Sequence, residues 1–323
     1  MESIIGKRGF VKTKQSVIST GKSILDTYNY MIDKNVTMMD FIKIFEDEGM
    51  CLELLFLLRF YSNNCHKCGC DMINNYSRTK GKRSYQCSRC GNQVYPTSGT
   101  IMQKTTTPID IWFYTLYHIC WNNKNTSAIQ IKKDITQCYT TAHRMLKLRR
   151  FALYQSDTQN KMKGTIEVDE AFLGKSKSFY KWGTVISTRK KPILGFYERE
   201  TGKVRVVMID KRDIDTLDDV FLANIEVGST VYTDGWSGYA NLGKYFKHEW
   251  VNHSMREYVR GDVTTNRIEG FWGLLKKNIG HAHASVSGEY VKNYIDEIVW
   301  KFNNRHLTSM QRFDDLLNRI LNN

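Results

Sequence analysis

Residues 266–277 read NRIEGFWGLLKK, a stretch with the periodicity of an amphipathic helix. At offsets of three and seven residues, Asn266, Glu269 and Lys276 fall along one side of that helix. An apolar stripe runs beside them and consists of Ile268, Trp272, Leu275 and Ile279. A carboxylate and an ammonium group two turns apart on a core-anchored helix suit a site that binds a metal ion and a phosphate together. An ordinary surface helix with one charge pair shows the same pattern, so the rest of the chain must decide.

Length and charge limit the possible classes of protein. The chain has 323 residues, enough for two or three domains with a sizeable core. Lysine and arginine outnumber aspartate and glutamate by 47 to 33, and the net charge of +14 favours a polyanionic partner, first of all nucleic acid. Residues 1–10 lack a signal-peptide core, and the most apolar run, residues 51–60, is too short to span a membrane. We therefore expect no membrane association and no secretion, with a location in the nucleus of a eukaryotic host or otherwise in the cytoplasm.

The cysteines indicate a structural metal site. Four of the eight form two Cys-x-x-Cys pairs with eighteen residues between them: Cys65, Cys68, Cys87 and Cys90. In a lysine-rich chain without a signal peptide, this spacing favours a closed tetrahedral zinc site, a zinc ribbon, over disulfides. Cys70 and His66 are spare residues that could replace one of the four ligands. A site with four thiolates stabilises a module too small for its own core and leaves no open position for catalysis.

Residues 104–155 have the pattern of three helices. The last covers about Tyr139–Tyr154, and its apolar positions, expected to face inward, are Ala142, Met145, Leu146 and Leu153. The basic positions, expected to face outward, include Arg144, Lys147 and Arg150. Three helices that end in a basic one are typical of a helix-turn-helix whose last helix enters the major groove of DNA. A helical linker with a solvated basic face is an equally consistent interpretation.

Beyond residue 164 the periodicity changes to that of strands. We predict strands at Thr165–Asp169, Pro192–Glu198, Lys203–Ile209, Ser229–Thr233 and Glu249–Asn252. Helices are predicted at Asp215–Ile225 and about Val286–Asn304. Three strands followed by a helix, a strand and further helices indicate a mixed α/β layer and not a barrel.

Two carboxylates close predicted strands. Asp169 ends the first strand and Asp234 ends the fourth, so both can converge with Glu269 of the helix. Three such groups would hold two divalent ions about 4 Å apart, the arrangement used for in-line displacement at phosphorus, and Mg²⁺ or Mn²⁺ fits oxygen ligands. Aspartates also commonly end strands by capping the next turn. Other acidic residues compete as ligands, namely Glu167, Glu170 and Asp262.

Several motifs together resemble one family. They are VDEAFLGK at 168–175, TDGWSGY at 233–239, the stretch 266–277, and FNNR at 302–305. In this order, after a zinc ribbon and a helical region, they resemble the DDE transposases of the Merlin type and their bacterial insertion-sequence relatives with an ISXO-like transposase domain. The resemblance covers about residues 40–306. It implies an RNase H-like catalytic domain in which Asp169, Asp234 and Glu269 bind metal and Lys276 contacts DNA. Because some relatives are described with asparagine in the third position, Asn266 is a further candidate.

The predicted fold class is α/β and multi-domain, with an RNase H-like catalytic domain preceded by a zinc ribbon and a helix-turn-helix-like domain. The predicted parts are a basic flexible arm, a helix plus zinc ribbon, a helix-turn-helix-like domain, the catalytic domain and a C-terminal tail, at 1–37, 38–103, 104–155, 164–306 and 307–323. The predicted function is a DNA transposase that binds terminal inverted repeats and catalyses metal-dependent cleavage and strand transfer. Its partners would be double-stranded repeat and target DNA, and two-ended chemistry favours a homo-oligomer.

Some expectations are less specific. The loop at 175–191 is expected to contact phosphates through Lys175, Lys177 and Lys181, although a solvated loop has the same composition. Trp236 and Trp272 are candidates for stacking on unpaired bases, and both residue types are more often part of a core. Two other functions fit the same motifs: a domesticated DNA-binding regulator without catalysis, and a hydrolytic nuclease that performs no strand transfer.

Overall fold

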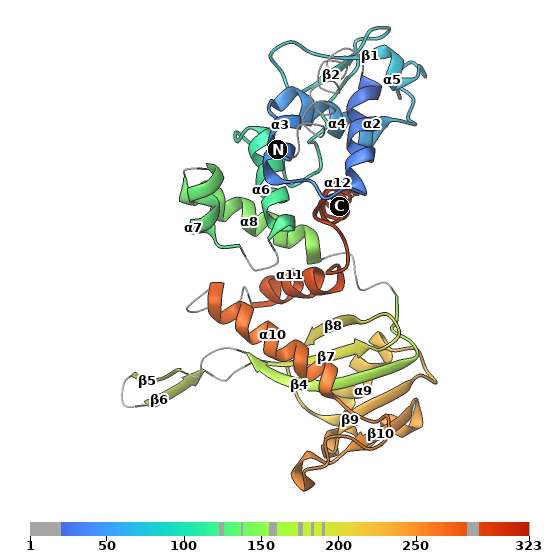
Figure 1. The fold of residues 1–323 in the computed structure, drawn as a ribbon, viewed down its shortest axis with the longest axis vertical. Coiled ribbons are helices and arrows are strands. Elements are labelled where there is room, and N and C mark those ends of the chain that lie inside the picture. The colour runs from blue at the N-terminus through green and yellow to red at the C-terminus, as the bar shows by residue number, and fades with distance from the viewer. Residues whose placement is uncertain are drawn as a thin grey trace, which may run out of the picture. The chain divides into compact units, whose positions relative to one another are not determined.

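The structure is a computed structural model, and it describes residues 21–122, 126–136, 138–154, 160–173, 177–181, 184–188, 191–282 and 291–322. The chain divides into two compact units. The first consists of Met1–Ala152 together with Leu307–Asn323, and the second is Leu153–His306. In Figure 1 the first unit runs from blue to green and includes the red C-terminal helix. The chain therefore leaves the first unit, builds the second and returns to complete the first.

Helices dominate the first unit. In chain order they are α2 (Gly21–Ile32), α3 (Met38–Ile44), α4 (Glu48–Phe60), α5 (Met72–Asn75), α6 (Ile109–Trp121), α7 (Ala128–Ile131), the π-helical turn η1 (Lys132–Thr136), α8 (Tyr139–Tyr154) and α12 (Ser309–Asn322). Side-chain caps start several of them: Thr37 accepts from Asp40 N, and Asp47 accepts from Gly49 N and Met50 N. A three-stranded antiparallel sheet, β1 (Tyr76–Arg78), β2 (Tyr85–Cys87) and β3 (Gln93–Val94), carries the cysteine motif.

An aromatic core closes the first unit around helix α12. The ring of Phe313 lies 5.0 Å from that of Phe41, 5.6 Å from Phe113 and 5.9 Å from Tyr117. These rings come from helices α3 and α6, which are more than 190 residues earlier in the chain. The expectation of a C-terminal tail at 307–323 is therefore wrong, because the segment forms a helix whose apolar face this core buries.

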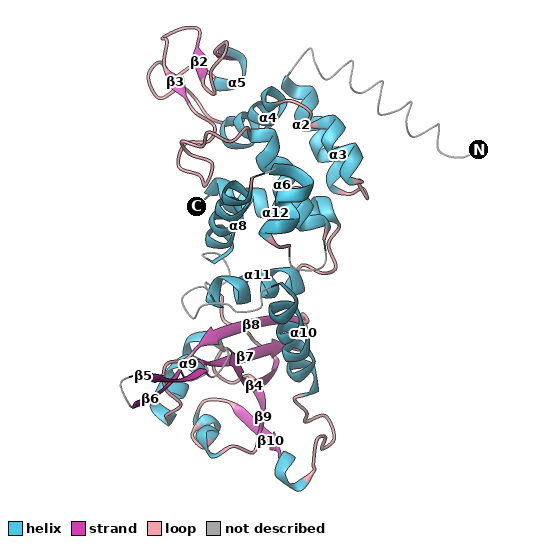
Figure 2. Cartoon of the chain, turned by 90° about the vertical axis from the view of Figure 1, so that its left-hand side faces the viewer, coloured by secondary structure: helices cyan, strands magenta, loops and turns pink. Residues whose placement is uncertain are grey.

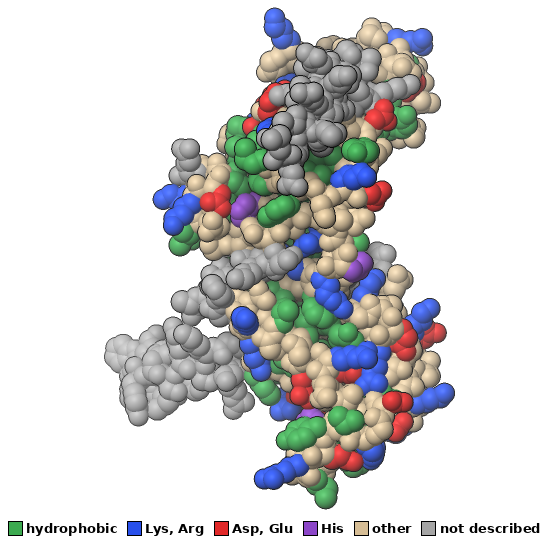
Figure 3. Space-filling view, viewed as in Figure 1, with side chains coloured by type: hydrophobic (Ala, Val, Ile, Leu, Met, Phe, Trp, Pro, Cys, Tyr) green, Lys and Arg blue, Asp and Glu red, His purple; other side chains and the backbone are tan. Residues whose placement is uncertain are grey.

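The N-terminal arm predicted at 1–37 also contains a helix. Residues 21–32 form α2, where Tyr28 is buried and donates its hydroxyl hydrogen to Asp314 Oδ1 at 2.8 Å. Residues 1–20 of that arm lie outside the described residues. No helix in the described ranges is long and apolar enough to cross a membrane. Figure 3 shows lysine and arginine side chains spread over the visible face of both units.

The second unit is built on a five-stranded mixed sheet. Its strands are β4 (Thr165–Leu173), β7 (Lys191–Glu198), β8 (Lys203–Met208), β9 (Thr230–Asp234) and β10 (Lys247–Val251). They lie in the order β10-β9-β4-β7-β8, as Figure 2 shows. Strands β4, β7 and β8 are mutually antiparallel, whereas β9 and β10 run parallel to β4. Three antiparallel strands with two parallel ones added beside the first form the RNase H-like sheet, so the predicted fold class is confirmed.

Helices cover both faces of this sheet. Helix α9 (Ile214–Asn224) packs on the face that carries Ile166 and Val168, with Phe221 in that core. Helices α10 (Asn266–Ala282) and α11 (Val291–Asn303) pack on the other face, where Ile268 and Trp272 join the core. Because side chains alternate along a strand, Glu167, Asp169 and Ala171 of β4 share the face covered by α10. In Figure 1, α10 crosses in front of the sheet and α9 lies behind it.

The FNNR motif at 302–305 acts at the edge of the sheet. The side chain of Asn303 accepts from Val204 N at 2.7 Å and donates to Val204 O at 2.9 Å. This pairs both backbone groups of an edge strand that would otherwise be free to bind another chain. Arg305 donates to Gly202 O at 3.0 Å in the turn before β8. In the described structure the motif therefore anchors the end of α11 to β8.

The segment at 175–191, expected to be a loop, contains strands. Residues Lys177–Lys181 (β5) and Thr184–Thr188 (β6) pair as an antiparallel hairpin. Three short 3₁₀ turns, η2 (Ser237–Tyr239), η3 (Leu242–Lys244) and η4 (His253–Met255), complete the described elements of this unit. The last of them belongs to the segment that leads from β10 into α10.

Candidate active site

Asp169 lies within strand β4, opposite Gly195 of β7. The sequence places it at the end of its strand, but β4 continues to Leu173 because pairing with β7 continues to Lys191. Asp169 is half-buried, and its Oδ2 accepts a hydrogen bond from Trp272 Nε1 at 3.0 Å. Helix α10 therefore contacts this carboxylate directly.

Asp234 is the last residue of strand β9, as the sequence predicts. Strands β4 and β9 pair in parallel, with Thr165 beside Thr230 and Glu167 beside Tyr232. Two residues further along both strands, the same register reaches Asp169 and Asp234. Their side chains lie on the same face, since residues at equal height on parallel strands point the same way. Asp234 Oδ1 also accepts from Trp236 N at 3.2 Å, which orders the turn that follows.

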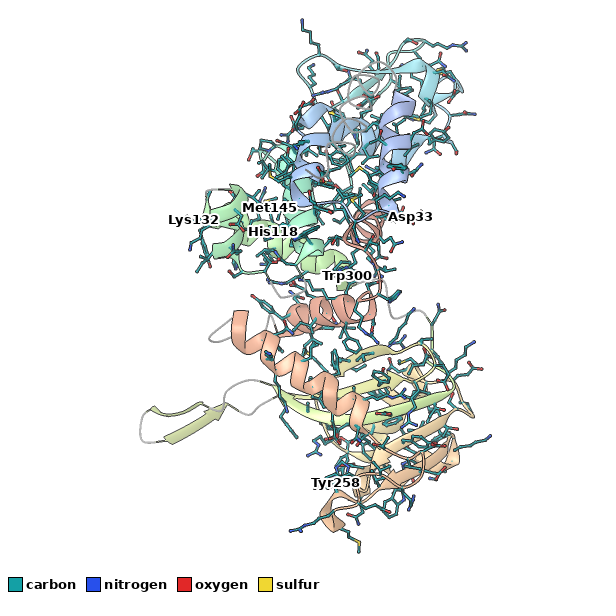
Figure 4. All side chains as sticks on the ribbon, in the orientation of Figure 1. Asp33, His118, Lys132, Met145, Tyr258 and Trp300 are labelled. Atoms are coloured by element: carbon teal, nitrogen blue, oxygen red, sulfur yellow. The ribbon has the colours of Figure 1, made fainter. Side chains whose placement is uncertain are left out.

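Glu269 comes from the first turn of helix α10 and is half-buried. Its Oε1 accepts a hydrogen bond from the Thr265 hydroxyl at 2.7 Å, and His253 Nε2 lies 3.7 Å from the same oxygen. The ring of His253 lies tilted by 39° against that of Tyr258, labelled in Figure 4, with 5.1 Å between the ring centres. Thr265 and His253 are thus polar neighbours of Glu269 that the sequence patterns do not single out.

Burial and two neighbouring carboxylates act on Asp169. The pKa of Asp169 is raised to about 6, first by burial and then by the charges of Asp234 and Glu269, while its own hydrogen bonds oppose the rise. A divalent cation at this point would neutralise that repulsion and favour the ionised carboxylates. These side chains supply the oxygen ligands that Mg²⁺ and Mn²⁺ favour, so the donor set fits such an ion.

Two of the three competing acidic residues bind other groups. Glu170 lies on the opposite face of β4, where its carboxylate binds Arg212 at 2.5 Å and accepts from the Tyr239 hydroxyl at 3.3 Å. Glu167 shares the face of Asp169, but it is fully buried and bonded to the backbone at the start of α10. Asp262 is exposed on the segment before α10. The contacts of Glu167 and Glu170 therefore disfavour these two residues as metal ligands, and Asp262 stays a candidate.

The remaining predicted residues of α10 lie where the helical pattern places them. Asn266 is the exposed first residue of the helix, and its N–H donates to Thr264 Oγ1 at 3.2 Å. Lys276 is exposed two turns beyond Glu269, about 10 Å along the axis. Of the two tryptophans considered for base stacking, Trp272 is only 4% exposed and bonds to Asp169. Trp236 is half-buried under the guanidinium of Arg212, 4.3 Å from its ring.

The four cysteines of the zinc ribbon motif come together. Their sulfur atoms all lie within 4.8 Å of one another, and within the described ranges no other set of three or more His, Cys, Asp or Glu ligand atoms gathers this closely. Cys65 and Cys90 are 3.6 Å apart, and Cys68 and Cys87 are 3.7 Å apart. Tetrahedral zinc with Zn–S bonds of about 2.3 Å requires sulfur separations of about 3.8 Å, so the cluster could hold zinc. Cys70 lies beside it, 3.4 Å from Cys68.

The basic residues predicted to bind DNA have different surroundings. On helix α8, Arg144 and Lys147 are exposed, and Arg144 also donates to Thr105 Oγ1 at 3.0 Å. Arg150 is only 5% exposed, so the expectation that it faces outward is wrong: this position of α8 is covered by packing. Lys175 lies outside the described residues. Lys177 and Lys181 begin and end β5, and their side chains are not among those described.

The sheet order and the acidic face covered by α10 define the class of this protein as RNase H-like. A family within this class can also be named, because residues 161–303 match the family model described as the ISXO2-like transposase domain. This part of the chain therefore resembles the transposase domain of insertion sequences. The Merlin-type subdivision stays a prediction.

Two relatives are similar over different lengths. An uncharacterized protein in transposable element ISH50 of Halobacterium salinarum is 27% identical over 271 residues, which cover 79% of this chain and 90% of the relative. An uncharacterized transposase-like protein of Haemophilus influenzae is 28% identical over 108 residues, covering 33% of this chain and 86% of the relative.

Solved structures show a more distant likeness. The HTLV-2 integrase catalytic core domain in complex with magnesium is 14% identical, covers 43% of this chain and 84% of its own, and has a TM-score of 0.27. A simian T-cell lymphotropic virus intasome in complex with a PP2A regulatory subunit is 12% identical, covers 53% of this chain and 63% of its own, and has a TM-score of 0.26. Likeness at this level carries no functional information.

Proposed function

We propose that this chain is a DNA transposase that binds the terminal inverted repeats of its element and catalyses metal-dependent strand cleavage and strand transfer. The observation that carries the proposal is the placement of Asp169, Asp234 and Glu269 at the sheet face covered by α10, where burial and then the charges of Asp234 and Glu269 raise the pKa of Asp169. Structural ion-pair networks also shift pKa values, but here burial and two neighbouring carboxylates raise the pKa of Asp169, a pattern typical of a metal site.

Asp169, Asp234 and Glu269 would hold two Mg²⁺ or Mn²⁺ ions. Such ions lower the pKa of an attacking water or hydroxyl and stabilise the leaving 3′ oxygen. The chain's own part is to fix the ligands: the sheet sets Asp169 and Asp234 in register, and helix α10 brings Glu269 to the same face. Lys276, exposed two turns along α10, would bind a DNA phosphate. Asn266, at the start of the helix, is a further candidate for the third ligand position.

The first unit would recognise the repeat DNA. The zinc ribbon supplies a folded module held by four thiolates, and helix α8 presents Arg144 and Lys147 on its exposed side. The net charge of +14 supports a polyanionic partner. Joining two transposon ends to one target favours a homo-oligomer acting on double-stranded DNA.

The test is Mg²⁺-dependent nicking of repeat-end DNA by the wild type, by Asp234→Ala and by Asp219→Ala. Asp219 is an exposed aspartate on α9, so it controls for the loss of a negative charge from the same unit. We expect nicking to fall at least a hundredfold for Asp234→Ala and to stay unchanged for Asp219→Ala. Equal nicking by all three proteins would refute the metal site.

Binding, nicking and joining assays on the same DNA separate the two alternative functions. Sequence-specific DNA binding without any cleavage would identify a regulator. Cleavage without joining of pre-cut ends would identify a hydrolytic nuclease.

A further inference from the structure

Glu167 is a buried carboxylate to which the proposed chemistry assigns no role. It lies two residues before Asp169 on strand β4 and is 0% exposed. Its Oε2 accepts hydrogen bonds from Arg267 N at 2.9 Å and Ile268 N at 3.3 Å, and its Oε1 accepts from Arg199 Nε at 2.7 Å. Both oxygens are therefore used, one by the start of helix α10 and one by a guanidinium.

Arg199 extends the same contact to the segment that leads into the helix. It donates to Asp262 O at 2.8 Å and to Thr264 O at 3.2 Å, while its guanidinium lies 4.7 Å from the ring centre of Tyr232. The buried charge of Glu167 is thus compensated, as a buried carboxylate requires. The path of the chain just before α10 is fixed by the sheet.

Glu167 accepts the hydrogen bonds that a capping side chain usually accepts. The first N–H groups of a helix have no partner within it, and a serine, threonine, asparagine or aspartate just before the helix commonly accepts from them. Thr265 stands at that position and is fully buried, but its hydroxyl donates to Glu269 Oε1 at 2.7 Å. Because Glu167 caps the helix from the neighbouring strand, the Thr265 hydroxyl is free to orient Glu269.

A second bond connects the same strand and helix in register. Asp169 of β4 accepts from Trp272 Nε1 of α10, two residues beyond Glu167 on the strand and four beyond Ile268 on the helix. Two strand residues span about 6.6 Å and four helical residues span about 6 Å. Because these two lengths are similar, the hydrogen bonds of Glu167 and of Asp169 to the helix can form at the same time. Helix α10 is therefore fixed along β4 at two points, one of which is the Asp169 carboxylate itself.

We propose that Glu167, Arg199 and Thr265, here called the α10 clamp, are positioning residues that set the distance and orientation of Glu269 relative to Asp169. This inference rests on the proposed metal-dependent function. The clamp touches neither the substrate nor the reacting atoms. It acts through the metal ligands, as residues behind a metal site do when they hold the ligating side chains in place.

The other unit offers a matched control. Glu48 also caps a helix from outside, accepting from Ile109 N at the start of α6 at 3.0 Å, and it also pairs with an arginine, Arg83, at 2.6 Å. Glu48→Gln and Glu167→Gln therefore remove the same kind of interaction. Only the second change lies beside the carboxylate triad.

The experiment measures Mn²⁺ binding from the signal of free Mn²⁺ in electron paramagnetic resonance, together with the Mg²⁺ dependence of nicking. Wild type, Glu167→Gln, Thr265→Val, Glu48→Gln and Asp169→Asn are compared as full chains loaded with zinc. Valine has the shape of threonine without the hydroxyl, so Thr265→Val keeps the packing. We expect Glu167→Gln and Thr265→Val to weaken Mn²⁺ binding and to raise the Mg²⁺ requirement by 10- to 100-fold, with unchanged affinity for repeat DNA.

The outcomes of this experiment decide between a positioning role and a merely structural role of the α10 clamp. If Glu167→Gln loses thermal stability as Glu48→Gln does but binds Mn²⁺ as tightly as the wild type, the α10 clamp is merely structural and the inference is wrong. If Glu167→Gln does not fold, Thr265→Val decides alone, and wild-type Mn²⁺ affinity in that variant overturns the proposal. A wild-type protein whose Mn²⁺ binding is absent, or is unaffected by Asp169→Asn, instead refutes the proposed function on which the clamp depends.

Discussion

At the scale of single residues, the proposed site depends on a carboxylate, that of Asp169, whose surroundings disfavour its ionised form. Asp169 is surrounded by sheet and helix, and two further acidic groups act on it, so its pKa lies at about 6 instead of 3.8. Between those two values the folded protein holds a proton that the unfolded chain releases. Such a group lowers stability at neutral pH, and proteins accept that cost at functional sites.

The raised pKa of Asp169 sets the direction in which stability changes with pH. Above pH 6 the ionised Asp169 disfavours the folded state, and below about pH 4 the group is protonated in both states. In the absence of added Mg²⁺ and Mn²⁺, Asp169→Asn should therefore raise the free energy of unfolding at pH 8. Two pKa units correspond to at most about 3 kcal/mol. The gain should shrink as the pH falls from 6 towards 4. For the wild type, the Mg²⁺ concentration needed for nicking should rise as the pH falls through 6, because protons compete with the ion for Asp169.

Differential scanning calorimetry at pH 8 and pH 4.5 measures this change. Glu226→Gln, an exposed carboxylate in the same unit, is the control for a lost charge. A gain from Asp169→Asn that is equal at both pH values would contradict a raised pKa of Asp169.

At the scale of secondary-structure elements, the contact between strand β7 and helix α10 holds the site together. Gly195 is buried opposite Asp169, and a Cβ atom there would lie 2.4 Å from Trp272 Cζ2 and 2.8 Å from Ile268 Cδ1. A side chain at Gly195 would occupy the space that the indole needs to reach Asp169. The absence of a side chain at this strand position therefore allows the helix to lie close to the sheet.

Gly195→Ala should accordingly move Trp272 away from Asp169. We expect a loss of about 1–3 kcal/mol in the stability of the second unit, from overpacking, and at least a tenfold loss of nicking. Gly273→Ala is the matched control, because a Cβ there meets nothing within 4 Å. In mid-helix it should stabilise the unit by up to about 1 kcal/mol. Calorimetry and nicking assays on both variants test the pair, and full activity in Gly195→Ala would show that the indole contact is dispensable.

At the scale of the whole molecule, the two ends of the described chain belong to one unit. Helix α12 brings Phe313 into a core of rings from α2, α3 and α6, although the entire RNase H-like unit separates these helices in sequence. The first unit therefore needs the C-terminal helix for its own stability.

Phe313→Ala tests this dependence. Removing a fully buried phenylalanine should cost about 3–5 kcal/mol in the first unit and leave the second unit unchanged. Met39→Ala, at a side chain that is 62% exposed on α3, should change stability by less than about 0.5 kcal/mol. Calorimetry with the two units followed separately would show a lowered transition for one unit only. A drop in both transitions would mean that α12 supports more than the first unit.

Much of the second unit was predictable because its patterns are local. Alternation identified the strands that contain Asp169 and Asp234, and the spacing within 266–277 located Glu269 and the buried stripe of α10. The cysteine spacing identified a cluster whose sulfur atoms do converge. The helix at 309–322 was missed although its periodicity is strong, since a short amphipathic segment at a chain end shows its partner only after folding.

The sequence by itself indicated a mixed α/β layer, the cysteine cluster and the candidate carboxylates, because strand alternation, helical periodicity and ligand spacing are properties of neighbouring residues. The RNase H-like class was implied by the resemblance of its motifs to a family. Only the tertiary structure decided which of two carboxylates on one strand face remains available. Glu167 and Asp169 have the same pattern in sequence, but the start of α10 and Arg199 use both oxygens of Glu167. That outcome depends on contacts between residues about a hundred positions apart, and no local pattern contains them.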